Sequence, residues 1–481
     1  MSFRNQGVMS RTASAALFLA LALGIAWAQD DGGQTAPPAD QAGAASSPDN
    51  PQQPPANPPI SGIDQPALEH GLTERSFLIP GAQISESVDS NVGNEFGDEA
   101  VHGVTRALGS LILQRLWNHY DLSLGYVGGA ALYSGFSESS SQVHQFDAVQ
   151  RIRWQRGQFA VRDEFSYLPE GSFGFGAYGG SGGYELGLGG IGMGGIALSP
   201  LGNFFGPGQF GSVGQAPRIT NISAADVTQD LTARSSVTAA GSYALVHFTD
   251  DNSGFIDSRQ TSAQAGYDYQ LTRRDQIALI YGFQDFRYPD LAGESFTTHL
   301  WHVLYGHRIS ERMDFIVGGG PQLTILDNPF LGSTHQLSLS GRAELRYKFP
   351  KTSLGIFYDH YNTGGSGFFP GAKSDIVRVS LARPITRKWD AMADIGYAHN
   401  SRIQSPLFGF GVNATSYQYV YAGAAVHRQL GRNFSVFVSY QFNELAFDSS
   451  FCAAGASCNR TSQRHVATIG LDWHPRPIKL D

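Results

Sequence analysis

The chain has 481 residues, and its composition differs from that of ordinary soluble proteins. Charged residues make up 15% of it, against roughly 25% in soluble chains, whereas Gly reaches 58 residues and aromatic side chains 12%. The net charge of −8 argues against nucleic-acid binding, which needs a basic face. Two Cys residues exclude a disulfide scaffold and a Cys-rich metal site, and we expect no metal or other cofactor. These features favour a large, charge-poor β protein.

The first 28 residues have the three parts of a secretory signal peptide. Arg4 and Arg11 carry the positive charge, and Ala13–Leu23 is an apolar run too short to span a bilayer. Ala26-Trp27-Ala28 then forms a small-residue cleavage site before Gln29. An uncleaved anchor helix is the alternative. We therefore expect residues 1–28 to direct the chain out of the cytoplasm.

Residues 29–66 hold nine of the 23 Pro residues, together with Gln, Ala, Asp and Gly. Such a stretch buries too little apolar surface to offset the entropy lost on ordering. We predict a disordered periplasmic linker here.

From about Ser76 to Trp473 the sequence repeatedly alternates between apolar and polar residues. In Gln336–Phe349, for example, Leu337, Leu339 and Leu345 share one parity while Arg342 and Glu344 share the other. Successive side chains of a strand point to opposite faces of the sheet, so this pattern predicts strands with one apolar and one polar face.

The connections between these segments alternate between short turns and long polar or Gly-rich loops. Eight short and nine long connections join eighteen strands, or sixteen if the first pair is short. Short periplasmic turns and long external loops are typical of a transmembrane β-barrel. We therefore predict an all-β, antiparallel, up-and-down transmembrane barrel over residues 67–475, followed by a periplasmic tail over residues 476–481.

Four Trp residues lie at the short-turn ends of predicted strands: Trp117, Trp154, Trp389 and Trp473. Ordinary core packing would explain any one of them. Together they are typical of the aromatic girdle at one interface of the membrane.

The opening strand Ile84-Ser-Glu-Ser-Val-Asp-Ser-Asn91, the up-and-down pattern and the late Val438-Ser-Tyr-Gln-Phe442 resemble uncharacterised β-barrel porins of Gram-negative-type outer membranes. Some members of these families are encoded near exopolysaccharide export genes. The resemblance implies an outer-membrane location, contact with its lipid and insertion by the barrel-assembly machinery. Such barrels often end on an aromatic residue, whereas eight residues follow Trp473 here, so the assembly signal is expected to be internal.

The polar face of the predicted strands carries many charged side chains. An Arg or Lys facing lipid at mid-depth would cost about 2–4 kcal/mol, whereas one facing a water-filled lumen costs little. We therefore predict that the following side chains face the lumen, either to set ion preference or to brace the wall as ion pairs: Asp147, Arg151, Arg153, Arg162, Glu164, Asp226, Asp230, Asp268, Arg342, Glu344, Arg346, Arg378 and Asp394. Asp163 falls on the lipid-facing parity with Val161 and Phe165, so a bulge or a register error is expected there.

Residues 171–215 form the third predicted external loop and contain 18 Gly but a single charge, Glu185. By analogy with general porins, this loop is a candidate for an inward constriction or plug. It can equally cover the mouth or stay outside. In the last external loop, Cys452 and Cys458 are close enough for a small disulfide, with free thiols as the alternative.

No local catalytic motif occurs, so we assign no catalytic residues and do not expect an enzyme. The favoured function is a porin-like channel for small hydrophilic solutes or saccharides. One alternative is a structural or exopolysaccharide-secretion-associated barrel whose lumen is plugged by the Gly-rich loop, with a polysaccharide as its partner. The other is an outer-membrane barrel enzyme. The lipid-facing strands would also tolerate a homotrimer.

Overall fold

We describe the protein from a computed structural model. The described residues all belong to one compact unit within residues 51–481 and comprise residues 59–62, 76–93, 96–97, 100–135, 140–168, 218–249, 255–291, 294–328, 332–349, 351–365, 367–403, 413–452 and 458–480. The predicted signal peptide, most of the predicted linker and the Gly-rich loop 171–215 lie outside them. Within the described part of the chain, no helix has the length and apolar character needed to span a membrane.

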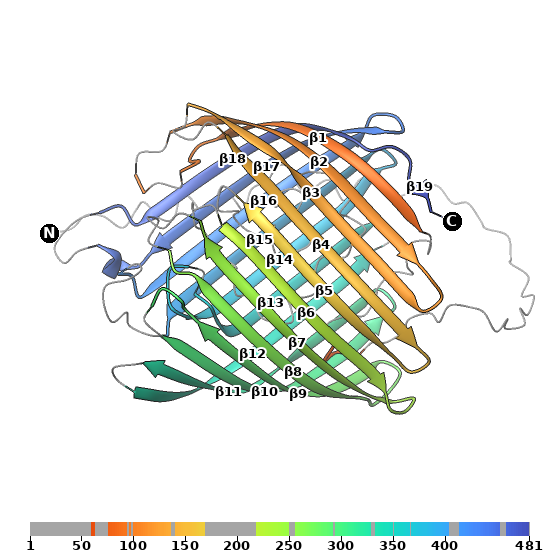
Figure 1. The fold of residues 1–481 in the computed structure, drawn as a ribbon, viewed down its shortest axis with the longest axis vertical. Coiled ribbons are helices and arrows are strands. Elements are labelled where there is room, and N and C mark those ends of the chain that lie inside the picture. Colours follow the sequence, from red (N-terminus) through yellow and green to blue (C-terminus); the bar gives the residue numbers. More distant parts are fainter. Residues whose placement is uncertain are drawn as a thin grey trace, which may run out of the picture. The chain divides into compact units, whose positions relative to one another are not determined.

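Eighteen long strands of the described residues form one antiparallel sheet (Figure 1). They are β1 (Phe77–Asp89), β2 (His102–Leu116), β3 (Tyr120–Ser134), β4 (Ser140–Trp154), β5 (Gly157–Leu168), β6 (Arg218–Asp230), β7 (Ser235–Phe248), β8 (Ser258–Gln270), β9 (Asp275–Arg287), β10 (Ser295–Ser310), β11 (Met313–Asn328), β12 (Gly332–Phe349), β13 (Thr352–Thr363), β14 (Ala372–Thr386), β15 (Trp389–Arg402), β16 (Ser416–Gln429), β17 (Phe434–Phe447) and β18 (Thr461–Trp473).

The sheet closes on itself. Each strand pairs with the next along the chain, and β1 also pairs with β18 from Ala82 opposite Trp473 to Asp89 opposite Val466. A two-residue strand, β19 (Ile478–Lys479), extends this seam by pairing with Phe77 and Leu78. Closure pairs the two edges that an open sheet would leave without backbone partners. The predicted antiparallel up-and-down barrel is confirmed, with eighteen strands rather than sixteen in its wall.

One end of the barrel consists of short turns. Leu231-Thr-Ala-Arg and Leu271-Thr-Arg-Arg form the same turn twice. In each, the Thr hydroxyl accepts hydrogen bonds from backbone N–H groups two and three residues later, which is a local side-chain turn that needs few residues.

The other end carries the longer connections, with one departure from the expected loops. The sequence predicts a long loop near Asp327–Thr334, but β11 and β12 have 16 and 18 residues and continue their pairing as far as Asn328 opposite Gly332. Much of the segment predicted as a loop is therefore paired as strand.

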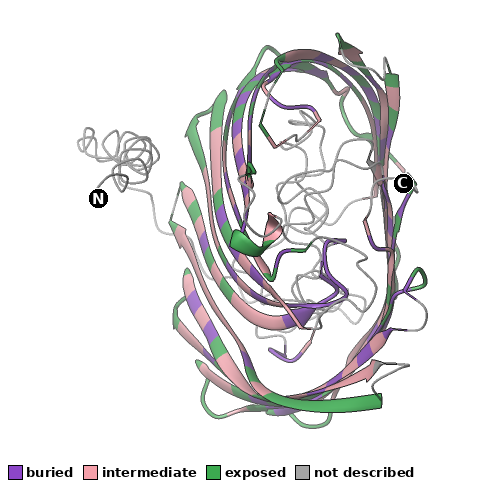
Figure 2. Ribbon diagram, turned by 90° about the vertical axis from the view of Figure 1, so that its left-hand side faces the viewer, coloured by how far each residue is buried: buried purple, intermediate pink, exposed green. Residues whose placement is uncertain are grey.

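The two faces of the wall differ in chemistry. In β17, Val438 on the outer face is 55% exposed, while its neighbour Ser439 on the inner face is 8% exposed. The same alternation of buried and exposed residues runs along most strands (Figure 2). Exposed large apolar side chains recur around the outer face, including Leu111, Leu279 and Ile469.

Candidate functional site on the inner wall of the barrel

All thirteen charged residues predicted to face the lumen lie on the inner parity of their strands. In β5, for example, Arg162 is 3% exposed, whereas its neighbour Val161 on the outer face is 44% exposed. The strands fix these positions, because each change of one residue reverses the direction of the side chain.

Most of these charges are joined in ion pairs between strands. Arg162 Nε lies 2.9 Å from Asp226 Oδ1, linking β5 to β6. Arg378 Nη2 lies 2.8 Å from Asp394 Oδ2, linking β14 to β15. The pairs follow the register, since residues on adjacent strands with the same face and level are neighbours.

A second group of ion pairs includes Asp121 and Asp314, two carboxylates that were not predicted from the sequence. Arg151 and Arg153 on β4 both contact Asp121 Oδ2 on β3, at 3.3 Å and 2.6 Å. Arg346 contacts Asp314 at 2.6 Å and Glu344 at 3.3 Å. Asp121 and Asp314 stand on the polar parity of their own strands, and this signal was available in the sequence.

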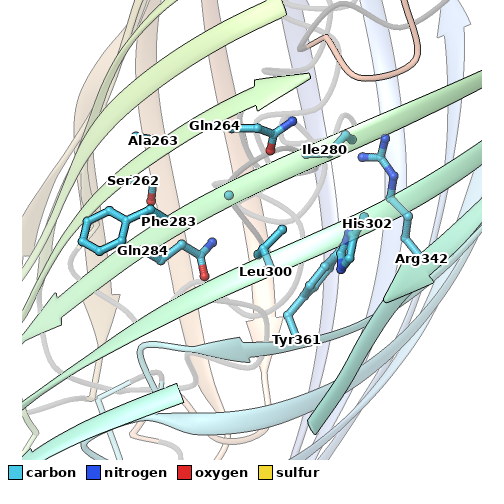
Figure 3. Close-up of a pocket in the computed structure, with 11 residues that line it drawn as sticks. Ser262, Ala263, Gln264, Ile280, Phe283, Gln284, Leu300, His302, Arg342 and Tyr361 are labelled. Carbon is cyan, nitrogen blue, oxygen red and sulfur yellow. The ribbon is translucent and has the colours of Figure 1, made fainter. Parts of the chain in front are cut away.

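A pocket lies on the inner wall between β8 and β13 (Figure 3). Its His302 ring stacks on Tyr361 with 6.3 Å between centroids, and His302 Nε2 lies 2.6 Å from Ser340 Oγ. The polar side chains that line it are Ser262, Gln264, Gln284, His302, Arg342 and Tyr361. Amide, hydroxyl and guanidinium groups beside aromatic rings can bind a solute that carries hydroxyl or carboxylate groups.

A short segment from the N-terminal part of the chain contacts the inner wall beside this pocket. Residues 59–62, inside the range predicted as a disordered linker, are described here, and Ser61 is fully buried. Arg342 Nη2 donates to the carbonyl of Ile60 at 3.0 Å, and Gln264 Nε2 donates to the carbonyl of Ser61 at 3.1 Å. These four residues depart from the expectation for the linker.

At the long-loop end, the connection between β13 and β14 folds against the inner wall. Phe368 and Phe369 are 5% and 0% exposed. The ring of Phe368 packs edge-to-face on the inward rings of Tyr417 and Phe447, and that of Phe369 packs at a tilt on Tyr417. Gly365, with a φ of +82°, allows the tight turn that starts this segment, since other residues rarely adopt that conformation.

The sequence reasoning placed an inward constriction in the Gly-rich loop 171–215, which lies outside the described residues. The inward segment that the structure does show, residues 364–365 and 367–371, was missed. Two adjacent Phe residues between Gly and Pro in an otherwise polar loop were the available signal.

The external connections are linked by Asp448, which follows β17. Its carboxylate accepts hydrogen bonds from the backbone N–H groups of Thr415, Ser416 and Ser450 at 2.9–3.1 Å. Although burial raises the pKa of Asp448, the hydrogen bonds from Ser450 and Thr415 lower it to about 2. The ionised carboxylate therefore joins two loops at the mouth over most of the pH range.

The four predicted girdle residues lie at the short-turn end of the barrel. Trp154 and Trp473 end β4 and β18, Trp389 begins β15 and Trp117 follows β2. Each exposes more than a third of its surface, between 37% and 47%. Cys452 and Cys458, at the opposite end, are joined by a disulfide.

Asp163 is the residue for which the sequence predicted a bulge or a register error. That prediction is wrong, because β5 pairs with β4 and β6 in unbroken register. Asp163 lies on the outer face, where Ser223 Oγ donates to its carboxylate at 2.5 Å and Asn221 Nδ2 donates to it at 3.3 Å. Two donors from β6 thus solvate an anion on the apolar side of the wall.

No protein-family model and no curated protein matches the chain. Among solved structures, it is similar to Pseudomonas aeruginosa OccK2 (OpdF) in complex with glucuronate, at 9% identity and a TM-score of 0.41, covering 86% of this chain and 100% of that chain. It is also similar to the outer membrane protein OpdK from Pseudomonas aeruginosa, at 10% identity and a TM-score of 0.40, covering 84% and 100%. Pseudomonas aeruginosa OpdL has 10% identity, a TM-score of 0.40 and coverage of 85% and 100%. We infer function from the geometry of this chain's own barrel.

Proposed function

We propose that the protein is an outer-membrane channel for small hydrophilic solutes, saccharides among them. The observation that carries the proposal is the closed wall with an apolar outer face and ion pairs on its inner face. Hydrocarbon solvates the first face and water the second, and a closed barrel leaves no strand edge exposed to lipid.

The size of the barrel supports a channel. About eight strands already enclose an interior that side chains fill, whereas barrels of 16–18 strands leave an aqueous path. Within this wall, the pocket of Gln264, Gln284, His302 and Tyr361 offers hydrogen bonds and a ring face. That combination suits the hydroxyl groups and the C–H faces of a sugar.

Location and partners follow from the same reasoning and belong to the proposal. A signal peptide over residues 1–28 would bring the chain to the periplasm, and the barrel-assembly machinery would insert it. Membrane fractionation tests this step, because the chain should be recovered with the outer membrane and migrate differently on gels before and after heating.

Channel activity is tested by the current through refolded protein in planar bilayers. We expect steady unitary currents, and in a salt gradient Asp230→Lys should shift the reversal potential toward anion preference, because Asp230 faces the lumen at its short-turn mouth. The matched control is Asp285→Lys, which makes the same charge change on the outer face and should leave the reversal potential unchanged. Absence of current would reject the channel, and equal shifts for both variants would reject the lumen position of Asp230.

The second candidate is a barrel whose lumen is plugged, and the inward packing of Phe368 and Phe369 favours it. It predicts silence from the full chain and current after removal of an inward segment. Deleting residues 171–215 tests the Gly-rich loop as the plug.

A further inference from the structure

We propose that residues 59–62 act as an intramolecular ligand of the inner wall. They bind a site that we call the socket, and there they narrow the lumen beside the solute pocket. We call these four residues the tether. The inference rests on the proposed channel function and adds to it a constriction that comes from the N-terminal side of the barrel.

The polar half of the socket binds Ser61. Its backbone N–H donates to Asp268 Oδ1 at 3.1 Å, and its hydroxyl contacts both the Asp268 carboxylate and Thr238 Oγ1, the latter at 2.6 Å. With Gln264 donating to its carbonyl, the donor and acceptor groups of Ser61 all have wall partners. Contacts that satisfy both backbone and side chain define a site for this segment and not a chance contact.

The apolar half of the socket binds Ile60, which is 5% exposed. Its neighbours are inward side chains of β9, β10 and β11: Ala278, Ile280, Leu304 and Ile316. Apolar side chains on the lumen face of a water-filled barrel would lose contact with water only if something covers them. Ile60 provides that cover, and burying such a side chain contributes about 1.5–3 kcal/mol.

Two glycines shape the wall to admit the tether. A Cβ added at Gly266 would lie 2.5 Å from Ser61 Cβ, and one added at Gly306 would lie 3.2 Å from Ile60 Cγ2. Both positions are on the inner parity, where any other residue would project into the socket. The wall is thus hollowed at the two places that the tether occupies.

The tether and the pocket share side chains. Gln264 and Arg342 bond the tether's carbonyl groups and also line the pocket. Figure 1 shows the tether as a short red segment near the ends of β8 and β9, and Figure 3 shows Gln264 and Arg342 among the pocket side chains. A solute that binds these two groups competes with the tether, so solute and tether should displace one another.

The first test displaces the tether from the socket. Gly266→Val should occupy the place of Ser61, and deletion of residues 59–62 should have the same effect without altering the wall. We expect both variants to raise unitary conductance in planar bilayers by about twofold or more, since a path obstructed at its narrowest part limits the current. The matched control is Gly423→Val, an inward glycine of β16 where an added Cβ would meet only the carbonyl oxygen of Tyr440, at 3.9 Å; this variant should conduct like wild type.

Locking the tether is the second test. Ser61→Cys with Thr238→Cys places two thiols where the hydroxyls now share a hydrogen bond, in a Cys452→Ser, Cys458→Ser background that removes the native disulfide. The oxidised protein should conduct less than wild type, because the tether cannot leave the socket. A reductant should restore the wild-type conductance. The background alone should not respond to reductant.

The outcomes separate the tether from the channel. If wild type, deletion and oxidised forms conduct equally, the tether proposal is rejected while the channel stands. If no form conducts, including the deletion, the proposed function itself fails. If the oxidised pair conducts more than the deletion, the tether does not narrow the path and the inference is wrong.

Discussion

Asp89 and Arg464 join the first and last strands of the barrel at the level of single side chains. Arg464 Nε lies 2.9 Å from each carboxylate oxygen of Asp89, and their side chains are 4% and 0% exposed. A buried pair of this kind adds little net stability over an apolar pair, but loss of one partner leaves a buried charge alone. The seam therefore depends on both residues.

We predict that Arg464→Gln lowers the free energy of unfolding by about 3 kcal/mol, because the Asp89 carboxylate keeps its burial and loses its cation. The measurement is the urea midpoint of refolded protein in lipid, followed by Trp fluorescence. Arg287→Gln is the control, since Arg287 is 73% exposed in its pair with Asp285 and should change stability by less than about 0.5 kcal/mol. Equal midpoints for wild type and Arg464→Gln would contradict the assignment.

At the scale of elements, the loop between β13 and β14 behaves as part of the wall. Its rings pack on Tyr417 and Phe447, the carbonyl of Gly367 accepts from the N–H of Ile256 at 2.9 Å, and Arg402 lies 4.7 Å from the ring of Phe369. These contacts come from β15, β16 and β17 and from the β7–β8 connection. The described residues of this loop therefore pack against the inner side of the wall at the long-loop end of the barrel.

We predict that replacing both Phe368 and Phe369 by Ala releases this segment and increases unitary conductance or its fluctuation, because the loop loses its buried anchors. Recordings on single channels measure the effect. The control is Phe349→Ala, at an exposed position at the opposite end of the barrel. Unchanged currents in the double variant would show that Phe368 and Phe369 do not limit the path.

At the scale of the whole molecule, the outer face has a local exception to its apolar character. Asp163 lies near the middle of β5, flanked across the sheet by Ala148 and Ser223. An anion with donors of its own, beside the small side chains of Ala148 and Ser223, is more stable against a second protein surface than against hydrocarbon. We propose that copies of the chain associate through the outer face of β5 and β6.

Asp163→Leu should then weaken this association while leaving the barrel folded. Crosslinking and native gels of outer-membrane extracts measure the ratio of oligomer to monomer, and heat-modifiable migration reports folding. Asp285→Leu, a carboxylate removed elsewhere on the outer face, should not change the ratio. A wild-type protein that is monomeric throughout would overturn the proposal.

The antiparallel barrel and the inward direction of the thirteen predicted charged side chains could be predicted from the sequence, whereas the choice between sixteen and eighteen strands needed the pairing of β1 with β18. Parity along a strand is a local property, so the alternation in Gln336–Phe349 and the inward direction of Arg162 follow without tertiary information. Alternating turn lengths added the up-and-down order, because short and long connections collect at opposite ends.

The tertiary structure alone decided which groups meet. Asp268 was predicted to face the lumen, but its partner Ser61 lies 207 residues away in sequence. The pairing of Asp89 with Arg464 depends on closure, and the packing of Phe368 on Tyr417 depends on how the β13–β14 connection folds against β16. Such contacts join points that are distant along the chain, and a periodic pattern carries no information about distance across a lumen.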